Sequence, residues 1–508
     1  MSYMRTITIS IEENHPLFQY ADRMTRLANN LSNAARFRQR QVLTAVSKQE
    51  ADWTENERTV MEEIRRTIPQ MKNAVEMPSG KKHFLGYRLL DAIMKYTGNP
   101  DYYAEGLPRQ TAQNVLKQAV KDMKGFYASC REYHKNPDSF TGKPVLPGYR
   151  KKGGHTTALV SNQDCKLKCL NGKWYAAFPF VKDTPVCIGS PIPNARLKQV
   201  CITPENGRYR LSFQIEVGAE LSKTSFIPER ICAIDFGLDN LMAVTNNCNL
   251  PFLIYKGGVA KAANQKYNKT IAAIVSEQTL RTGKKFVPDA AYYAATNRRN
   301  DQINDFMHKC AKHLITWCVE NRIDTIVMGV NPLWKQKICL GHKNNQEFVQ
   351  IPIDTLRSMI HYLSEWNGIR CVKQEESYTS KASFPDLDPI PVYGEETEQE
   401  FAFSGKRKPT QYAGMKKSDG FRGLYVTKSG LIINSDLNGS ANILRKAYPQ
   451  AFDGSALPEF KNVIVIRHPY IENRKENRNQ QLSVVKSMSH AKRKRQERKA
   501  RSFFCAAV

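Results

Sequence analysis

Three acidic residues stand at the ends of apolar, strand-like runs, where an unpaired carboxylate is costly. Asp235 closes the run in ICAIDFGLDN, Glu376 follows the run at residues 368–375, and Asp436 lies between an apolar run and a helical pattern in LIINSDLNGSANIL. Taken alone, Asp235 is explained as a turn-forming acid and Asp436 as a helix cap. Their recurrence at strand ends indicates a shared site.

If these strand ends meet at one edge of a sheet, the acids form a site for two divalent cations about 4 Å apart. Such ions activate a water molecule and stabilise the leaving oxygen, which is the chemistry of phosphodiester hydrolysis. Oxygen ligands favour magnesium, with manganese as a substitute, over zinc, which prefers Cys or His. No Ser-His-Asp or Cys-His arrangement competes for this role.

The elements that position these acids form an α/β pattern at residues 229–381, completed by residues 431–455. The strand ICAIDFG is followed by the strand-like runs AVTNN and FLIYKGG and a long charged helical region. The buried strand IDTIVMGV, another helix and the strand GIRCVKQE come next. This order, strands first and then strand alternating with helix, is typical of a ribonuclease H-like domain.

Two regions with other sequence patterns precede this domain, so we predict a multidomain α+β protein. Residues 15–139 place apolar side chains at helical spacing. Residues 140–228 carry short runs rich in Val, Ile, Tyr and Phe, with the turn sequence ENG between two of them, which predicts a small β-barrel. The strand-like residues 1–14 are expected to supply its first strand.

Two segments of the C-terminal half carry a basic, polar composition. Residues 382–430 are rich in Pro, Gly and Lys, and they form either a mobile basic loop or a lid near a DNA strand. Residues 456–508 end in AKRKRQERKAR. Like charges repel one another and offer nothing to pack, so we expect this tail to be disordered until it meets nucleic acid.

The formal net charge of +28, from 76 basic and 48 acidic residues, indicates a polyanionic partner, with nucleic acid as the expected one. A generally basic surface without a specific partner is the alternative. Predicted contacts lie in the helical region, in the loop LPGYRKKGGH and in the long charged helix. They are Arg36, Arg38, Arg150, Lys151, Lys152, Arg298, Arg299 and Lys309. A solvated helix face or a plain turn explains the same residues without a ligand.

Other classes of protein are disfavoured by what the sequence lacks. No run of about 18 uncharged apolar residues is present to span a bilayer. The N-terminus alternates like a strand and does not resemble a secretory signal. We therefore expect a cytoplasmic, nucleoid-associated bacterial protein with no membrane partner. The 12 cysteines are scattered without a second pair at metal-ligand spacing, so they are expected to be reduced or inert.

The strings IDFGLDNLMAV and NSDLNGSANIL resemble the first and third RuvC motifs of the TnpB proteins. These are RNA-guided nucleases of insertion-sequence transposons and relatives of type V CRISPR effectors. MGVNPLWKQ and EESYTSKASF are similar to the middle of that family. The resemblance implies a RuvC nuclease domain and, more loosely, a wedge β-barrel at residues 140–228 and a helical recognition lobe at residues 15–139.

The sequence departs from that family at two places. Most members end the strand IDTIVMGV with a glutamate, where this chain has Gly329. A subset looks similar, with the glycine and a relocated glutamate together, so the resemblance gives the role to Glu376, with Glu375 as the alternative. No cysteine lies between residues 372 and 504, where many relatives carry a zinc module. No structural zinc is therefore expected, and residues 382–430 take its place.

The resemblance implies a magnesium-dependent, RNA-guided DNA endonuclease, a monomer on one guide RNA. The guide would pair with the target, and the protein would read a short flanking motif in the double-stranded DNA. Asp235, Glu376 and Asp436 would then hold the metal ions for cutting. A compact type V CRISPR effector with the same chemistry, a nuclease-dead RNA-guided repressor and a transposase that transfers strands are the alternatives.

Overall fold

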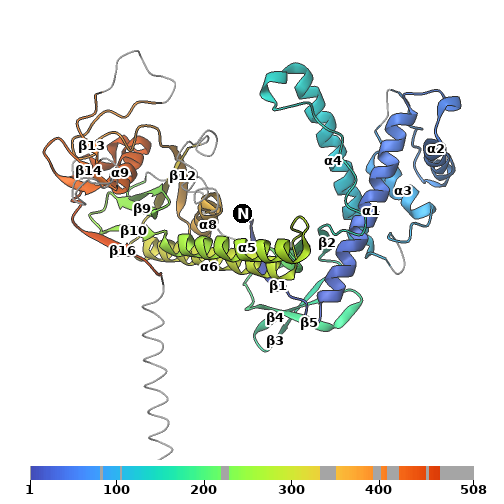
Figure 1. Ribbon diagram of the computed structural model, residues 1–508, viewed down its shortest axis with the longest axis horizontal. Coiled ribbons are helices and arrows are strands. Elements are labelled where there is room, and N and C mark those ends of the chain that lie inside the picture. Colours follow the sequence, from blue (N-terminus) through green and yellow to red (C-terminus); the bar gives the residue numbers. More distant parts are fainter. Residues whose placement is uncertain are drawn as a thin grey trace, which may run out of the picture. The chain divides into compact units, whose positions relative to one another are not determined.

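The computed structural model describes residues 2–80, 84–102, 106–218, 228–331, 351–392, 402–408, 423–453 and 457–469. The chain is a mixed α/β protein that divides into two compact units, Met1–Ser222 and Lys223–Val508. Figure 1 follows both units along the chain. No helix in the described ranges is long and apolar enough to cross a membrane.

The first unit contains the helices predicted for residues 15–139. Their bounds are Phe18–Ala45 for α1, Glu55–Thr67 for α2, Tyr87–Tyr96 for α3 and Arg109–Lys135 for α4. α1 packs against both α2 and α4. It does so because its buried residues recur every three or four positions, as at Ala21, Met24, Ala28 and Leu31.

Two antiparallel sheets complete the first unit, in the orders β1-β7-β6-β2 and β3-β4-β5. The strands are β1 Ser2–Ile11, β2 Ala158–Ser161, β3 Lys166–Leu170, β4 Lys173–Phe178, β5 Val181–Gly189, β6 Ala195–Glu205 and β7 Arg208–Gly218. The predicted N-terminal strand is confirmed, because β1 pairs with β7 along its whole length. The predicted hairpin is also confirmed: Asn206 and Gly207 join β6 to β7 with φ of 46° and 77°. No described strand pairs across the two sheets, so a closed barrel is not confirmed.

Side chains of α1 hold the basic loop at residues 146–155 by its backbone. Asn33 donates to the carbonyl of Arg150 at 3.1 Å and accepts from its N–H at 2.8 Å. Arg36 donates to the carbonyl of Gly148 and also pairs with Asp122 of α4 at 2.9 Å. Polar residues of α1 therefore fix the course of this loop.

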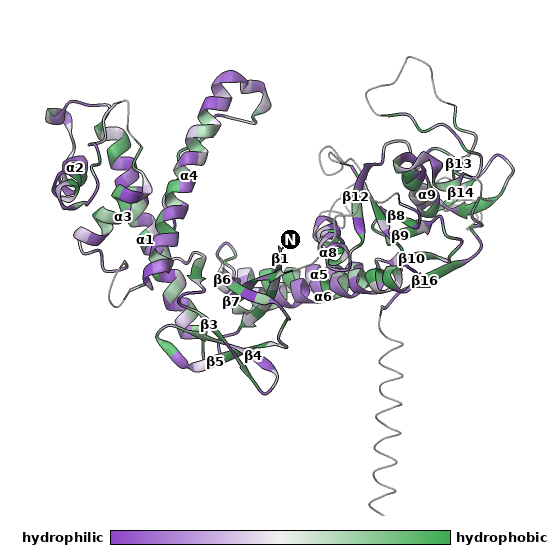
Figure 2. Ribbon diagram, turned by 180° about the vertical axis from the view of Figure 1, so that it is seen from behind, coloured by the Kyte–Doolittle hydropathy of each residue, from purple (hydrophilic) through white to green (hydrophobic). Residues whose placement is uncertain are grey.

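A six-stranded sheet forms the core of the second unit, in the order β12-β11-β8-β9-β10-β16. The strands are β8 Ile231–Phe236, β9 Asn240–Asn246, β10 Phe252–Lys256, β11 Thr325–Val330, β12 Arg370–Glu375 and β16 Val463–Ile466. β9 is antiparallel to its two neighbours, and the other pairs are parallel. The carboxyl ends of β8, β10, β11, β12 and β16 therefore lie at one edge of the sheet, where β9 begins. Figure 2 shows β8, β10 and β16 as predominantly hydrophobic.

Helices cover both faces of this sheet. They are α5 Gly258–Thr282, α6 Ala290–Glu320, α8 Ile353–Trp366 and α9 Ser435–Ala447. Alternate residues of β8 face different helices: Cys232 and Ile234 share a core with α6 and α8, and Ile231 and Ala233 pack with Ile443 of α9. α5 and α6 lie side by side along their length (Figure 1).

The segments predicted as insertion and tail contain structure that the sequence did not indicate. Within 382–430, β13 (Lys406–Arg407) and β14 (Leu424–Val426) pair into a small sheet with β15 (Ile432–Asn434). The prediction that the whole of 456–508 is disordered is wrong, because residues 463–466 form β16 beside β10. One short apolar run, paired with a strand some 200 positions earlier, carries no local signal. The basic end, residues 470–508, lies outside the described residues.

We expect Arg36→Met to destabilise the first unit by about 2 kcal/mol, because Asp122 and the carbonyl of Gly148 lose a charged donor. Thermal melting, together with the rate of proteolysis in residues 146–155, measures the effect. Arg26→Met is the control, because the pair of Arg26 with Asp22 is exposed and spans one helical turn. Equal melting temperatures for the two variants would contradict the proposed loop anchor.

Candidate active site

Asp235 lies near the carboxyl end of β8 on the face that α9 covers. It follows Ile231 and Ala233 in the strand alternation, and both pack against α9. A Cβ atom built on Gly439 of α9 would lie 2.6 Å from Asp235 Oδ2. Only a glycine at this position lets the helix backbone approach the carboxylate so closely.

Asp436 lies in the first turn of α9, and its carboxylate is not the cap of the helix. Asn434 is the cap, because its side chain accepts from the N–H groups of Asp436 and Leu437. Asp436 Oδ2 accepts from Asn240 Nδ2 at 2.7 Å, and Oδ1 lies 3.6 Å from the guanidinium of Arg407. Asp436 is thus available to a ligand at the sheet edge.

Buried polar side chains of α9 fix the helix to its surroundings. Ser440 donates to the carbonyl of Ala233 in β8 at 2.8 Å. Asn438 and Asn442 both donate to the carbonyl of Ala382. Burying these groups is tolerated because each has a backbone partner. The polar residues of SDLNGSANIL therefore set the position of α9, and with it the position of Asp436.

Glu376 follows β12 directly, and its carboxylate occupies the space beside Gly329. The N–H of Glu376 continues the ladder by donating to the carbonyl of Val330. A Cβ atom on Gly329 would lie 2.8 Å from Glu376 Oε2 and 2.6 Å from Ile443 Cδ1. A side chain at position 329 and the carboxylate of Glu376 therefore exclude one another. Within the described residues, Glu376 Oε2 is buried and has no hydrogen-bond partner.

Glu375 has different partners. Its carboxylate accepts from Lys446 Nζ at 2.8 Å and from the N–H of Ser377 at 2.6 Å. Burial alone would raise the pKa of Glu375, but these hydrogen bonds hold it below its usual range. Glu375 thus holds the last turn of α9, where Lys446 also suits the helix dipole.

Burial raises the proton affinity of Asp235 and Glu376, the two acids nearest the sheet. Burial, then Asp436, then Glu376 raise the pKa of Asp235 well above its ordinary value, against Arg407 and Arg357. Burial also raises the pKa of Glu376, against the positive charge of Arg357. The positive charge of the nearby arginines is therefore too small to offset the burial of the two carboxylates.

Arg357 of α8 is a cation that sequence reasoning did not single out. Its guanidinium donates to the carbonyl of Gly329 at 3.0 Å and lies over the ring of Phe236, 4.8 Å from the centroid. Asp354, one turn earlier, is its ion-pair partner at 3.0 Å. Only the spacing of these two residues on a helix was visible in the sequence.

The acids fit hard divalent cations better than zinc. The donors are carboxylate oxygens, and one of them is buried without a hydrogen bond, a cost that a bound cation would remove. No group of three His, Cys, Asp or Glu side chains in the described ranges is suited to hold one ion. The carboxylates of Asp235, Glu376 and Asp436 therefore remain candidate ligands.

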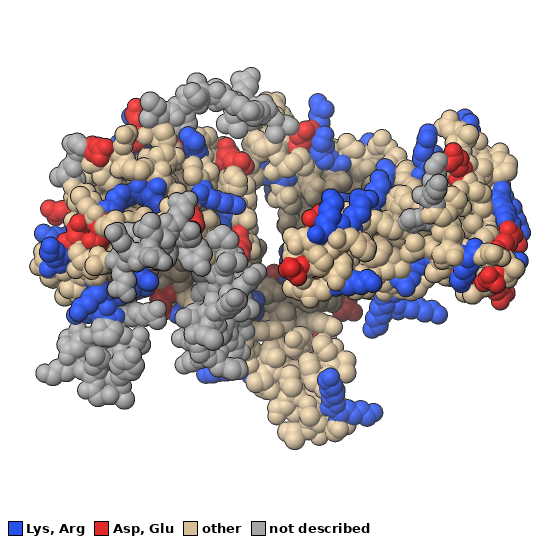
Figure 3. All heavy atoms as spheres, turned by 90° about the horizontal axis from the view of Figure 1, so that it is seen from above, with Lys and Arg blue, Asp and Glu red and all other residues tan. Residues whose placement is uncertain are grey.

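The predicted nucleic-acid contacts fall into two groups. Four already have protein partners: Arg36 with Asp122, Arg38 with Glu63, Arg299 with Asn264 and Lys309 with Asp305. Burial also lowers the pKa of Arg150 and of Arg299. Lys151, Lys152 and Arg298 are exposed. Lys and Arg cover more of the face in Figure 3 than Asp and Glu do. The exposed group suits phosphate contacts, and these contacts stay a prediction.

Arg298 and Arg299 border a pocket of about 230 Å³ between α5 and α6. Arg299 also lies over the ring of Tyr267, 5.8 Å from its centroid. Trp334 and Lys335 of the string MGVNPLWKQ lie outside the described residues.

Residues 212–332 match the family OrfB_IS605, described as "probable transposase". The match includes Asp235 and Gly329, and it confirms the resemblance to the transposon family that the RuvC-like strings indicated. No curated protein sequence matches the chain.

Solved structures with a similar arrangement are distant in sequence. The Cas12f1–sgRNA–target DNA complex has 12% identity and a TM-score of 0.40, over 82% of this chain and 82% of that chain. The mini-RNA-guided endonuclease CRISPR-Cas_phi3 has 9% identity and a TM-score of 0.44, over 88% and 92%. Alicyclobacillus acidoterrestris C2c1 in complex with single-guide RNA has 8% identity and a TM-score of 0.30, over 82% and 70%.

Gly439→Ala is expected to lower the melting temperature, although alanine favours a helix by about 1 kcal/mol. The new Cβ would press on Asp235 Oδ2, and overpacking of this kind costs about 1–3 kcal/mol. Gly125→Ala in α4 is the matched control, because a Cβ there meets nothing within 4 Å. That variant should gain stability. A gain at both positions would show that Asp235 does not lie against α9.

Asp235→Asn should stabilise the metal-free protein at neutral pH. The raised pKa of Asp235 means that the folded chain holds its proton to higher pH than the unfolded chain does. Stability is therefore lost as pH rises above the unfolded value, and asparagine avoids this loss. Melting in EDTA should show the variant a few degrees higher at pH 7.5, with the gap closing toward pH 4. If the difference in melting temperature instead widened at lower pH, folding would lower the pKa of Asp235 and not raise it.

Proposed function

We propose that this chain is an RNA-guided DNA endonuclease. It would bind a structured guide RNA, read a short flanking motif in target DNA and hydrolyse phosphodiester bonds with magnesium ions held by Asp235, Glu376 and Asp436. The observation that carries the proposal is the buried carboxylate of Glu376, which fills the space beside Gly329. The position of this carboxylate supports Glu376 as the replacement for the missing glutamate of the second motif.

The sheet supports a ribonuclease H-like domain. Its order, β12-β11-β8-β9-β10, puts the first strand of the unit at the centre, with the two hairpin strands on one side and the two crossover strands on the other. The candidate acids come from the central strand, from the end of β12 and from the helix on one face. Such an edge brings residues distant in sequence to one site, as in other α/β folds.

Bound magnesium would supply a Lewis acid and an activated water. The chain supplies the geometry. Asp235, held against Gly439, would hold magnesium together with Glu376 and Asp436. Arg357, which donates to the carbonyl of Gly329, is placed to orient the strand end that carries the glycine, and Asn240 orients Asp436.

Recognition of nucleic acid is supported by charge and by the family match. The net charge of +28 exceeds what solubility requires. The helices and sheets of the first unit, with Lys151 and Lys152 exposed on an anchored loop, would form the recognition lobe and wedge that the resemblance implies. Guide RNA and double-stranded DNA are the proposed partners, in a cytoplasmic complex with one copy of the chain.

Two alternatives differ from the proposal by a single property. A compact type V CRISPR effector would use the same chemistry with a guide from a repeat array. A repressor that binds without cutting would need the site to be inactive, and the buried carboxylate of Glu376 beside Gly329 argues against it.

Cleavage of guide-matched DNA tests the proposal directly. We expect protein co-purified with RNA from its own locus to cut in magnesium and to stop in EDTA. Asp235→Ala and Glu376→Ala should each lower the rate at least a hundredfold, because the loss of a metal ligand costs several kcal/mol and about 1.4 kcal/mol is a factor of ten. Glu375→Ala should retain most of the activity.

The same variants separate the alternatives. Tight binding of matched DNA without cutting by wild type would establish the repressor instead. If Glu375→Ala abolished cutting and Glu376→Ala did not, the second ligand would be Glu375. Melting curves for all variants exclude a simple loss of folding, which matters because Glu375 holds Lys446.

A further inference from the structure

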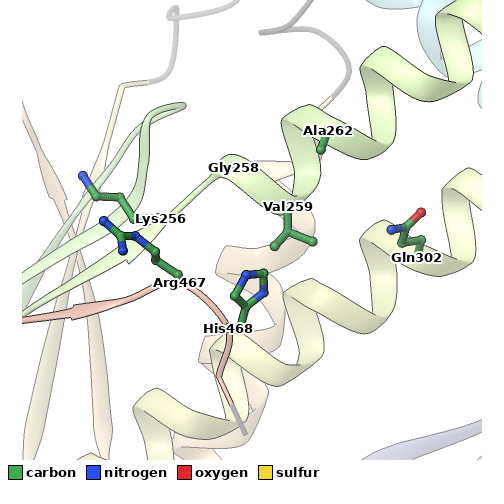
Figure 4. Close-up of a pocket in the computed structure, with 7 residues that line it drawn as sticks. All are labelled: Lys256, Gly258, Val259, Ala262, Gln302, Arg467 and His468. Carbon is green, nitrogen blue, oxygen red and sulfur yellow. The ribbon is translucent and has the colours of Figure 1, made fainter. Parts of the chain in front are cut away.

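A cavity of about 470 Å³ lies where β10 and β16 end beside α5 and α6 (Figure 4). Its exposed surface is almost entirely apolar. Two cations border it, but the ammonium group of Lys256 donates to Asn240 Oδ1 at 2.6 Å, and the guanidinium of Arg467 is turned away from the cavity. Proteins bind single-stranded nucleic acids with cations and aromatic rings together. The described lining of this cavity does not provide that combination.

The loop at residues 147–154 of the first unit does provide it. Tyr149 is 52% exposed, and Lys151 and Lys152 are exposed a few positions later. Three residues of chain span at most about 11 Å, so all three side chains can reach one or two nucleotides. Tyr149 was not singled out from the sequence. One exposed aromatic ring is ordinary on a protein surface, so the evidence for a site must come from the way in which the loop holds Tyr149.

Side chains of α1 hold the backbone of this loop at several points. The donors recur every three or four positions, so they lie on one face of the helix. They are Asn29, Asn33, Arg36 and Arg40, which donate to the carbonyls of Lys151, Arg150, Gly148 and Pro147 in that order. Ordering a loop when a partner binds costs conformational entropy, and here α1 has already fixed the backbone. The side chains of the loop are therefore positioned before any partner binds.

Arg40 fixes the ring of Tyr149 as well as the backbone of the loop. Its guanidinium lies over the ring, 5.3 Å from the centroid. The same side chain donates to the carbonyl of Pro147 at 3.0 Å, two residues before Tyr149. One face of the ring is thus covered by a cation, and the exposure of the side chain leaves the opposite face to a ligand. A flat ring held in this way is a surface on which a nucleobase can stack.

We propose that the loop at residues 147–154 binds an unpaired nucleotide of the guide RNA. The base stacks on Tyr149, and Lys151 and Lys152 contact the neighbouring phosphates. The inference rests on the proposed function, and it names the residue of the first unit that contacts a base. A structured RNA exposes unpaired bases in its loops, whereas target DNA is double-stranded until the guide pairs with it. A stacking surface that is formed before any partner binds therefore suits the RNA.

The test uses the full chain and the RNA that co-purifies with it, which is stripped from the protein in high salt, end-labelled and returned. Tyr149→Ala should weaken RNA binding about tenfold and leave its salt dependence unchanged, because stacking is lost and no phosphate contact is. Tyr149→Phe keeps the ring and should bind like wild type. Lys152→Ala should instead reduce the salt dependence by about 0.7, the share of one phosphate in a single strand.

Tyr96→Ala is the matched control. Tyr96 is also exposed, at 40%, and Lys95 lies over its ring, 5.3 Å from the centroid. It lies at the end of α3, outside the anchored loop, so this variant should bind the RNA like wild type. Melting curves for all variants identify any that fail to fold. Because Tyr149 is half exposed, we expect Tyr149→Ala to melt like wild type.

Cleavage of guide-matched DNA in magnesium separates a failure of this site from a failure of the nuclease. Equal RNA binding by wild type, Tyr149→Ala and Tyr96→Ala, with cutting by wild type, would overturn the stacking site and leave the nuclease standing. Weaker RNA binding by Tyr149→Ala alone, with no cutting by wild type, would overturn the nuclease and keep the RNA site. If Tyr149→Ala bound the RNA normally and a 20-nucleotide oligothymidylate less tightly, the choice of RNA would be wrong.

Discussion

The repulsion among Asp235, Glu376 and Asp436 is the constraint on which the second unit depends. Carboxylates that share a half-buried site cannot all be ionised without positive charge, and the raised pKa of Asp235 is the consequence of burial and of these two neighbours. The protein counters this only in part, with Arg357 and Arg407. Cations bound from solution would supply the remaining charge, so the arrangement is better suited to binding metal than to stability.

Two glycines, which have no side chain, leave room for the carboxylates of these acids. Gly439 admits the carboxylate of Asp235, and Gly329 admits that of Glu376. The proposed role of Glu376 therefore depends on Gly329, whose missing side chain leaves room for the carboxylate beside β11. A loss of activity does not follow from Gly329 alone.

The sequence indicated the acids more clearly than their surroundings. Apolar runs ending in Asp235 and Asp436 have strong local patterns, as do the β6–β7 hairpin and the pairing of α1 with its neighbours. The different surroundings of Glu375 and Glu376 could not be read from alternation, because Glu375 is held by Lys446, 71 positions later. Arg357, Asn240 and Arg407 were missed for the same reason. β16 was missed because its only partner is distant in sequence.

Along the edge of the sheet, charge changes sign once, from acids at β12 and β8 to cations at β10 and β16. Glu376 follows β12 and Asp235 ends β8, Asn240 begins β9, and Lys256 and Arg467 end β10 and β16. Parallel strands enforce this order, because they bring their carboxyl ends to one side whatever their separation in the chain. A polyanionic strand lying along such an edge would meet cations at one end and, through metal ions, acids at the other.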